Sequence, residues 1–493
     1  MEHASTSTPK PAPTRHEVVI LGAGMSGLCM AVQLKRAGVH DFVILEKSAG
    51  LGGTWWDNRY PGAHVDVPAP LYSFSFAPNP NWRRRFAAAP EIRAYMGDVA
   101  ARFGVDAHIR LGQTVSAARF DESSGLWHIN TALGQSYVAR FFVCSTGPLS
   151  VPRWPDIPGI ERFAGQRLHS AAWDAGVPLQ GRRIALIGTG SSAAQLLAPL
   201  VQRAAALTLF QRNANWVLPR IDRRYGRLDR ALARLPPYSA AVRAFWFHVL
   251  EWGRRGFDDG SFARRTLQRA AERHLQRQVR HEALRQQLRP TFPLGCKRII
   301  YANDYYPALQ RPHVSLVTES IARVAEDGVV SADGQLHKAD VLVCATGFDV
   351  QHSLATLPIT GAAGRSLAQA WAGGPHAHLG LTVAGFPNLF LMLGPNTATG
   401  HTSTLLYIEP GARWIVRAMH EVQRRGKRWL AVKPEVMQAS NQALQQRLQP
   451  LVWSQCRSWY RADTGLNFAI WPGFTGEYVR AVQRQRFADF SFG

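Results

Sequence analysis

Two glycine-rich motifs in the chain are each followed, at the same distance, by a side chain of opposite charge. Residues 22–27 read GAGMSG, and Glu46 follows 24 residues after the first glycine. Residues 188–193 read GTGSSA, and Arg212 follows at the same offset. At this position of a dinucleotide-binding unit, an acid accepts hydrogen bonds from ribose hydroxyls, whereas a base suits a ribose 2′-phosphate. The spacing therefore predicts two dinucleotides, one of which carries a 2′-phosphate on its ribose.

FAD beside NADPH is the pairing that fits these two charges, and it predicts redox chemistry. FAD carries an ordinary ribose, whereas NADPH carries a 2′-phosphate. The residues that we expect to bind the cofactors are Gly22, Gly24, Gly27 and Glu46 for FAD, and Gly188, Gly190, Ser191, Ser192 and Arg212 for NADPH.

Each motif has the strand–turn–helix–strand surroundings that position such residues. In this context the glycines allow a tight turn, and a pyrophosphate rests on the helix N-terminus. Ala193 takes the place of a third glycine, which the pattern permits. The expected elements are a strand at 17–21, a helix at 28–37 and a strand at 42–45 around the first motif, and a strand at 184–187, a helix through residue 200 and a strand at 207–210 around the second.

A repeated strand and a helical insertion complete the predicted organisation. Residues 142–147 and 342–347, FVCSTG and LVCATG, both read as buried strands that end in Thr-Gly. The predicted fold class is α/β, with two Rossmann-like domains, for FAD and NADP. The expected parts are a disordered lead-in at 1–14, the FAD domain at 15–150 and 375–493, and the NADP domain at 151–374. The last carries a helical insertion at about 222–290, broken at Pro236-Pro237, and a final helical region spans 410–448.

Two longer signatures resemble those of the type I Baeyer–Villiger monooxygenases. Residues 163–174 match F-x-G-x-x-x-H-x-x-x-W-D through Phe163, Gly165, His169 and Trp173. Residues 52–66 match G-G-x-W-x(4)-Y-P-G-x(3)-D. Both occur in order among the two nucleotide motifs, and the resemblance covers roughly residues 15–493.

The resemblance implies a definite reaction. NADPH reduces FAD, oxygen adds to the flavin C4a position, and the resulting peroxide attacks a ketone to give an ester or lactone. Such chemistry requires a positive group near the reacting oxygen. Arg298 matches the family's active-site arginine, and Asp66 matches the carboxylate that orients it. From composition alone, Arg298 would be a surface arginine and Asp66 a turn residue.

Further residues gain a role through the same resemblance. Lys297 and Arg212 match the pair that holds the NADPH 2′-phosphate, where two cations suit one phosphate. His169 matches a residue of the segment that links the nucleotide domains, so a structural role is expected rather than that of a base. The other residues expected beside the cofactors are Gly53, Thr54, Trp55, Tyr60, Asn396 and Trp459, with Trp55 and Tyr60 packing on the flavin.

One segment departs from the family pattern. The G-A-N-x-P-G-K sequence of cycloalkanone enzymes is absent, and GLN at 465–467 and WPGF at 471–474 stand there instead. The substrate pocket of those enzymes is therefore no guide to this one.

The net charge of +23 comes mainly from arginine, since only 7 of the 57 basic residues are lysines. The arginines occur all along the chain without a nucleic-acid-binding motif, which favours a solvated basic surface, and no nucleic-acid partner is expected.

The five cysteines, residues 29, 144, 296, 344 and 456, form no C-x-x-C, so neither a disulfide framework nor a metal site is expected. A reduced, cytoplasmic setting fits, and no stretch is long and apolar enough for a transmembrane segment.

The sequence alone leaves three functions open. The leading hypothesis is an FAD-containing, NADPH-dependent monooxygenase that acts on a ketone with O2. A flavin monooxygenase that oxygenates sulfur or nitrogen is the close alternative. A flavoprotein that binds nucleic acid or a membrane through its charge belongs to another class. A dithiol reductase would need the absent C-x-x-C.

Overall fold

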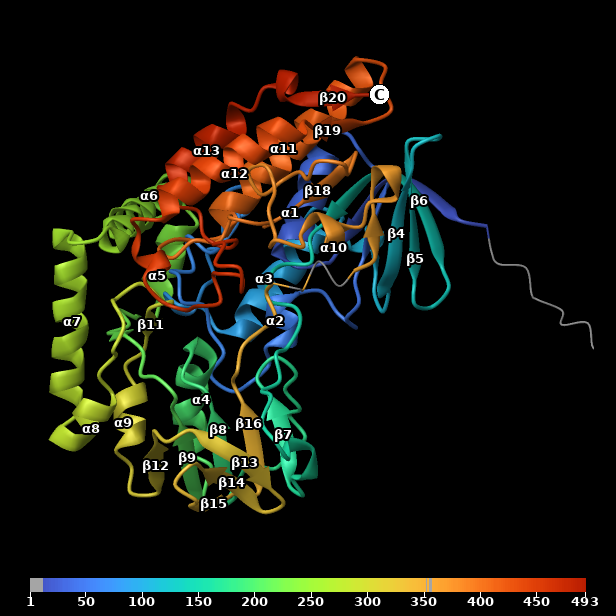
Figure 1. Cartoon of the computed structure of the whole chain (residues 1–493). Helices are drawn as coiled ribbons and strands as arrows, with labels where there is room; N and C mark the ends of the chain where they lie inside the picture. Colours follow the sequence, from blue (N-terminus) through green and yellow to red (C-terminus); the bar gives the residue numbers. More distant parts are fainter. Residues whose placement is uncertain (1–11, 352, 354–356) are drawn as a thin grey trace, which may run out of the picture.

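Two sheets hold the two glycine motifs, and Figure 1 shows them in the upper and lower halves of the molecule. The computed structural model describes residues 12–351, 353 and 357–493. Most of the expected lead-in lies outside the described residues. The prediction was wrong at its end, because Thr14 already pairs with Tyr137 in a strand.

The first sheet has eight strands, and parallel pairing surrounds the first motif. β1 lies between β2 and β6, and Gly22 follows it directly. All four residues of β2 are buried, as expected for a parallel strand covered on both faces. The strands are β1 (Thr14–Leu21), β2 (Phe42–Leu45), β3 (Ile109–Arg110), β4 (Val115–Asp121), β5 (Leu126–Thr131), β6 (Ser136–Cys144), β17 (Ile359–Thr360) and β18 (Leu389–Leu391).

The second sheet has five strands, all parallel, in the order β12-β9-β8-β16-β7. The second motif follows β8, just as the first follows β1. The strands are β7 (Gln166–His169), β8 (Arg183–Ile187), β9 (Ala206–Phe210), β12 (Val314–Val317) and β16 (Val341–Cys344). Smaller sheets combine β13 (Ile321–Ala325), β14 (Gly328–Ser331) and β15 (Leu336–Lys338), then β10 (Val217–Leu218) with β11 (Ile300–Tyr301), and β19 (Leu430–Val432) with β20 (Phe490–Phe492).

The helix of each motif begins directly after its second glycine. α1 (Met25–Arg36) and α4 (Ser191–Val201) have Gly24 and Gly190 as their N-terminal caps, without a side-chain cap or an acid in the first turn. Their first backbone N–H groups are thus available to an anion. The other helices are α2 (Thr54–Asp57), α3 (Ala89–Arg102), α9 (Tyr305–Leu309), α10 (Leu367–Ala370), α11 (Leu405–Arg424), α12 (Pro434–Leu448) and α13 (Thr475–Gln483).

The expected helical insertion forms a column of helices along one edge of the molecule (Figure 1). The two prolines begin a helix, where a proline loses no hydrogen bond, and so separate it from the helix before. The insertion contains α5 (Arg227–Ala233), α6 (Pro236–Gly253), α7 (Phe262–Gln278) and α8 (Glu282–Gln287).

The C-terminal part of the chain returns to the first sheet. β18 pairs with β6, and α11 lies beside α1. β17 already pairs with β4, so the first returning strand precedes residue 375. α11 begins at Leu405 with Pro410 inside it, five residues before the expected start of this helical region.

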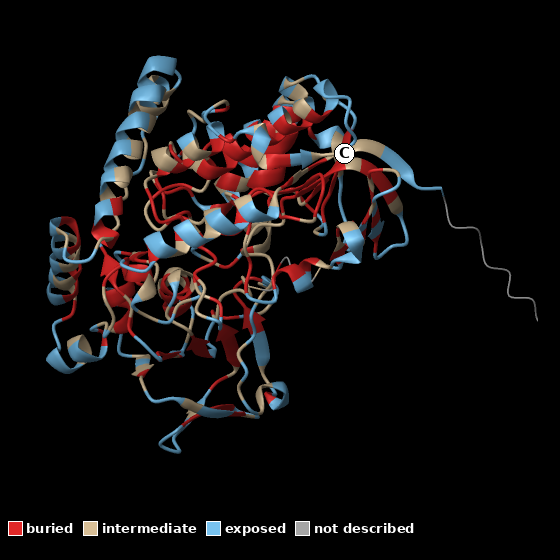
Figure 2. Cartoon of the chain, turned by 45° about the horizontal axis from the view of Figure 1, so that its top comes forward, coloured by how far each residue is buried: buried red, intermediate tan, exposed pale blue. Residues whose placement is uncertain are grey.

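Burial follows this layering, with the sheets and the helices against them buried and the edge helices largely exposed (Figure 2). Among the described residues, no helix has the length and apolar character needed to cross a membrane.

Candidate active site

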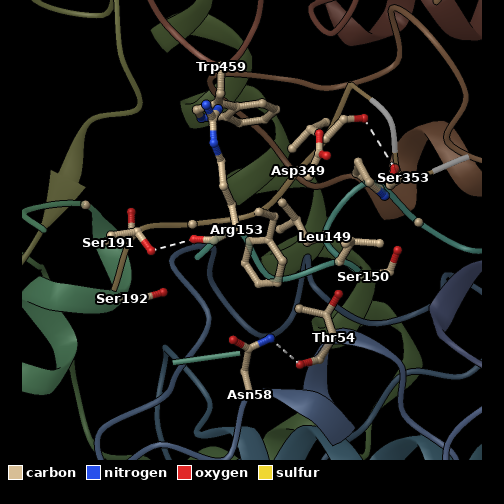
Figure 3. Close-up of a pocket in the computed structure, with 18 of the residues that line it drawn as sticks. Thr54, Asn58, Leu149, Ser150, Arg153, Ser191, Ser192, Asp349, Ser353 and Trp459 are labelled. Carbon is tan, nitrogen blue, oxygen red and sulfur yellow. Dashed lines mark hydrogen bonds between the residues drawn. The ribbon is translucent and has the colours of Figure 1, made fainter. Parts of the chain in front are cut away.

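A cavity of about 1840 Å³ is lined by both glycine motifs. This volume exceeds that of a typical single-ligand pocket, about 300–1,000 Å³, and suits more than one large ligand. Figure 3 shows Thr54 and Asn58 on one side, Ser191 and Ser192 on another, and Trp459 on a third. The predicted site residues that line the cavity are Gly22, Gly24, Glu46, Gly53, Thr54, Trp55, Tyr60, Asp66, Gly188, Gly190, Ser191, Ser192, Arg212, Lys297, Arg298 and Trp459.

The first motif closes tightly around the start of α1. Gly22 has φ +101°, which favours glycine, and a Cβ at Gly27 would lie 1.9 Å from the Gly22 carbonyl oxygen. The Glu46 carboxylate is buried and accepts hydrogen bonds from the backbone N–H groups of Ala23, at 2.7 Å, and Ser48, at 2.8 Å. The acid is therefore fixed at the cavity wall. This cradle fits FAD, because a bare backbone faces the pyrophosphate position and a carboxylate faces the ribose position.

The second motif presents positive charge instead. Arg212 and Lys297 both line the cavity, and Lys297 has its pKa lowered by burial first and by Arg212 second. The Lys297 ammonium also lies 4.4 Å from the centre of the Phe292 ring. Within the described part of the chain, no carboxylate pairs with either cation. Two neighbouring uncompensated cations fit the 2′-phosphate of NADPH.

Arg298 and Asp66 meet at the cavity wall although 232 residues separate them. The Arg298 Nε donates to Asp66 Oδ2 at 2.7 Å, and Nη2 lies 2.6 Å from the same oxygen. This pairing raises the pKa of Arg298 above its usual value. Nη1 points to the Thr399 carbonyl oxygen at 3.5 Å. The guanidinium is thus oriented and permanently charged.

Aromatic side chains around this pair remain neutral. Burial raises the pKa of Tyr60, Tyr72 and Tyr460 to about 12 in each case. The Trp55 indole N–H donates to the Tyr72 hydroxyl at 3.0 Å, and the Tyr60 hydroxyl donates to the Gln195 Oε1 at 2.9 Å. The wall near Arg298 therefore combines one cation with uncharged aromatic rings.

The 163–174 signature lies beneath the cavity wall. His169 is buried, its Nδ1 accepts a hydrogen bond from the Ala171 N–H at 3.1 Å, and burial lowers its pKa. A Cβ at Gly165 would lie 2.3 Å from the Asp340 carbonyl oxygen. Phe163 is buried, Trp173 is partly buried, and none of the four signature residues lines the cavity. This geometry supports a structural role for His169.

Asn396 and Trp459 occupy different positions relative to the cavity. Asn396 is buried and donates to the carbonyl oxygens of Asn467, at 2.8 Å, and Ile470, at 3.1 Å, so it supports the segment that departs from the family pattern. Trp459 is 41% exposed and packs against the Tyr460 ring at 4.4 Å. Asn396 does not line the cavity, whereas Trp459 does.

The expectation that the cysteines form no disulfide was wrong. Cys296 and Cys456 are joined by a disulfide with a Cα–Cα distance of 6.1 Å. The partners lie 160 residues apart, so no local spacing reveals them. The bond ties the segment of Lys297 and Arg298 to the segment of Trp459. Disulfides are rare in reduced compartments, so the cysteines no longer support a cytoplasmic setting.

Sequence reasoning missed a chain of polar contacts behind Arg298. The Thr399 hydroxyl lies 3.1 Å from His401 Nδ1, and His401 Nε2 lies 3.2 Å from Glu251 Oε2. Glu251, on α6, also accepts from the backbone N–H groups of Thr475 and Gly476. These contacts connect the helical insertion to the loop beside Arg298. No sequence motif marks them.

Comparisons with known proteins agree with this architecture. Residues 19–226 match the pyridine nucleotide-disulphide oxidoreductase family. A Baeyer–Villiger monooxygenase of Pseudomonas aeruginosa is 39% identical over 487 residues, covering 98% of this chain and 92% of that protein. One of Streptomyces coelicolor is 40% identical over 481 residues, covering 96% and 92%.

Solved structures extend the likeness to the whole fold. An oxidized steroid monooxygenase bound to NADP has a TM-score of 0.86 at 29% identity, covering 97% of this chain and 99% of that one. A complex of OTEMO with FAD and NADP has a TM-score of 0.87 at 25% identity, covering 98% and 100%. The predicted α/β fold class with two dinucleotide-binding domains is confirmed.

Proposed function

The chain belongs to the Baeyer–Villiger monooxygenases, and from this premise we propose which of its residues carry out the reaction. It is an oxidoreductase that uses FAD, NADPH and O2 to insert one oxygen atom next to a ketone carbonyl, which gives an ester or lactone. The relatives favour this reaction over the oxygenation of sulfur or nitrogen.

Arg298 is the catalytic residue in this proposal, and its fixed position in the cavity wall carries the argument. When bound, NADPH supplies a hydride and FAD activates dioxygen for insertion. Arg298 places a permanent charge where negative charge develops on the carbonyl oxygen of the substrate, which stabilises the transition state. Asp66 holds the guanidinium through two of its nitrogens, so little reorganisation is needed during the reaction.

The binding roles follow the two sides of the cavity. Gly22, Gly24, Gly53, Thr54 and Glu46 form the FAD side, with Trp55 and Tyr60 excluding water, and Gly27 lets α1 pack closely. Gly188, Gly190, Ser191 and Ser192 with Arg212, Lys297 and Trp459 form the NADPH side. Asn396 supports the wall between them, and Phe163, Gly165, His169 and Trp173 support the link between the domains.

We assign residues 15–150, together with the returning segment from β17 onward, to FAD and the residues between them to NADP, with the ketone bound between the two domains; the second boundary thus lies before Ile359 and not at residue 375. Because the neutral rings of Tyr72 and Tyr460 line the cavity near Arg298, we propose a ketone with apolar flanks. A cytoplasmic location stays an untested prediction, now without the support of reduced cysteines.

Product analysis with isotopic oxygen tests the assignment. The purified enzyme, given NADPH, ¹⁸O₂ and a panel of apolar ketones and sulfides, is expected to yield an ester with one ¹⁸O atom. Arg298→Ala is expected to lower the rate of ester formation by about 10²- to 10³-fold while the flavin content stays constant. Arg298→Lys keeps the charge but loses the forked donors, so its loss is smaller.

Arg323→Ala, at an exposed arginine of β13, is the matched control and is expected to retain the parental rate. Ester formation by Arg298→Ala at the parental rate would contradict the catalytic role of Arg298. Sulfoxide without any ester from the panel would contradict the assigned reaction.

A further inference from the structure

α6 is an apolar helix with no buried residue. It reads PPYSAAVRAFWFHVLEWG, and its two charged residues, apart from a histidine, are Arg243 and Glu251. An apolar helix of a globular protein usually buries a large part of its surface. The question is therefore which molecule covers the apolar surface of this helix.

Both charged side chains of α6 point toward the protein. Arg243 donates to the carbonyl oxygens of Pro70, at 3.1 Å, and Ser73, at 2.7 Å. Glu251 accepts from the N–H groups of Thr475, at 3.1 Å, and Gly476, at 3.0 Å. With Trp246, Phe247 and Leu250 packed against the core, these contacts fix which face of α6 points outward.

The outward face is an apolar stripe. Tyr238, Phe245, Val249 and Trp252 are 37%, 59%, 41% and 45% exposed. With the exposed Ala241 between the first two, they recur every three or four residues and so share one side of the helix. The neighbouring segments add Ile221, Leu228, Leu235 and Phe262, so eight of the thirteen exposed large apolar side chains of the described residues lie between 221 and 262.

Unpaired arginines flank this stripe. Residues 220–269 contain twelve arginines and five acidic residues. Each acid is engaged within the protein, in ion pairs with Arg84, Arg223, Arg254 or Arg264, or with His401. Arg227 and Arg234 precede α6 and Arg255 follows it, and all three are exposed without an ion pair in the described part of the chain. The insertion thus presents an apolar stripe between excess positive charges.

We propose that the outer face of the insertion, centred on α6, binds the surface of an anionic phospholipid bilayer. An interfacial helix places an apolar face with Trp and Phe at the headgroup–acyl boundary and keeps cations at the lipid phosphates. Tyr238 and Trp252 lie at the two ends of the stripe, which suits the amphipathic boundary. The flanking arginines complement the charge of such a leaflet.

The excess positive charge beside the stripe favours an anionic lipid surface over a second copy of this chain or a nucleic acid. A second copy of this chain would bring the same uncompensated arginines against the stripe, and their repulsion opposes such a pair. Nucleic acid would contact the arginines but leave the aliphatic and aromatic stripe in water. An anionic bilayer satisfies both features at once. The proposal concerns binding and does not depend on the substrate of the enzyme.

Vesicle flotation of the full-length flavoprotein tests this proposal. The protein is mixed with vesicles of phosphatidylcholine alone or with an equal part of phosphatidylglycerol. We expect flotation with the anionic vesicles and a loss of binding as the salt concentration rises. The double variant Phe245→Ser, Trp252→Ser is expected to lower the partition coefficient about tenfold or more. Arg227→Glu with Arg234→Glu is expected to lower it at least about fivefold for each arginine, because each cation is lost and an anion replaces it.

Matched controls separate the face from general surface effects. Leu133→Ser, at a 68% exposed leucine of the β5–β6 turn, and Arg311→Glu, at an exposed arginine outside the insertion, are expected to float like the parent. Flavin content and thermal unfolding verify that each variant is folded. Absence of parental flotation, or equal flotation of parent and Phe245→Ser, Trp252→Ser, overturns the proposal. A parental dimer that this double variant dissociates, without vesicle binding, assigns the face to a second copy and also overturns it.

Discussion

The two glycine motifs share a sequence pattern but differ in how closely the chain packs around them. At Gly27 an added Cβ would lie 1.9 Å from a backbone oxygen, whereas the equivalent residue of the second motif is Ala193. A Cβ at Gly24 would lie 3.6 Å from the Gly53 Cα, whereas nothing lies within 4 Å of one at Gly190. At their first glycines both motifs are tight, since a Cβ would lie 2.8 Å from a backbone oxygen at Gly22 and 2.5 Å from one at Gly188. At the second and third positions the first motif is closed by its own chain, and the second is open.

The charged side chain of the first motif is likewise held more firmly by the protein than those of the second. Glu46 is buried and held by two backbone N–H groups, so it forms a fixed part of the wall. Arg212 is exposed, and Lys297 has a pKa lowered by burial and by Arg212. A fixed, closed site suits a cofactor that stays bound, and an open, cationic site suits one that exchanges during each turnover.

The largest effect is expected from adding a methyl group at a position where the first motif has no room for one. Gly27→Ala is expected to destabilise the fold by about 3 kcal/mol and to cause loss of FAD, because the added methyl group meets backbone. Gly190→Ala is expected to retain FAD and to raise the KM for NADPH, since this glycine allows close approach of the pyrophosphate. The flavin-to-protein ratio and the melting temperature measure both results. Equal FAD loss in the two variants would contradict the comparison.

Removing a phosphate contact affects only the open site. Arg212→Ala is expected to raise the KM for NADPH about 10- to 100-fold, because a hydrogen bond to a charged group is lost, and to change that for NADH little. Steady-state kinetics with both nucleotides measure the difference, with Arg323→Ala as the control. If both KM values rise equally, Arg212 does not bind the 2′-phosphate.

A smaller effect is expected from the disulfide, which joins the segments of Lys297 and Trp459 on the open side. Cys456→Ser frees these segments from each other, so the KM for NADPH is expected to rise severalfold while the flavin content stays constant. A thiol reductant should change the parent in the same direction and leave Cys456→Ser unchanged. Identical kinetics of the parent with and without reductant would show that the bond does not support this site.

The smallest effect concerns pH. Because the pKa of Lys297 is lowered, its ammonium loses its proton at a lower pH than an ordinary lysine, and phosphate binding weakens as pH rises. The KM for NADPH is therefore expected to increase on the alkaline side before that for NADH. Lys297→Arg should remove this increase, because a guanidinium stays charged. An unchanged pH profile in Lys297→Arg would exclude this origin.

Local patterns predicted the elements around each motif well. The strand expected at 42–45 is β2, and those expected at 184–187 and 207–210 lie within β8 and β9. A hydrophobic run between glycine turns depends on neighbouring residues and is visible in the sequence. The insertion was harder to predict. The sequence predicts a solvated basic surface, and exposed arginines do flank its longest helix; α6 itself exposes an apolar stripe, because its two charged residues turn inward to distant partners.

The sequence by itself determined the two motifs and their opposite charges, because each depends on residue type and short spacing. Arg298 and Asp66 became candidates through the resemblance of their surroundings to the family signatures. The tertiary structure decided which residues meet. It joins Arg298 to Asp66 over 232 residues and Cys296 to Cys456 over 160. Contacts over such separations depend on how two sheets and their connecting segments pack, and no local pattern encodes them.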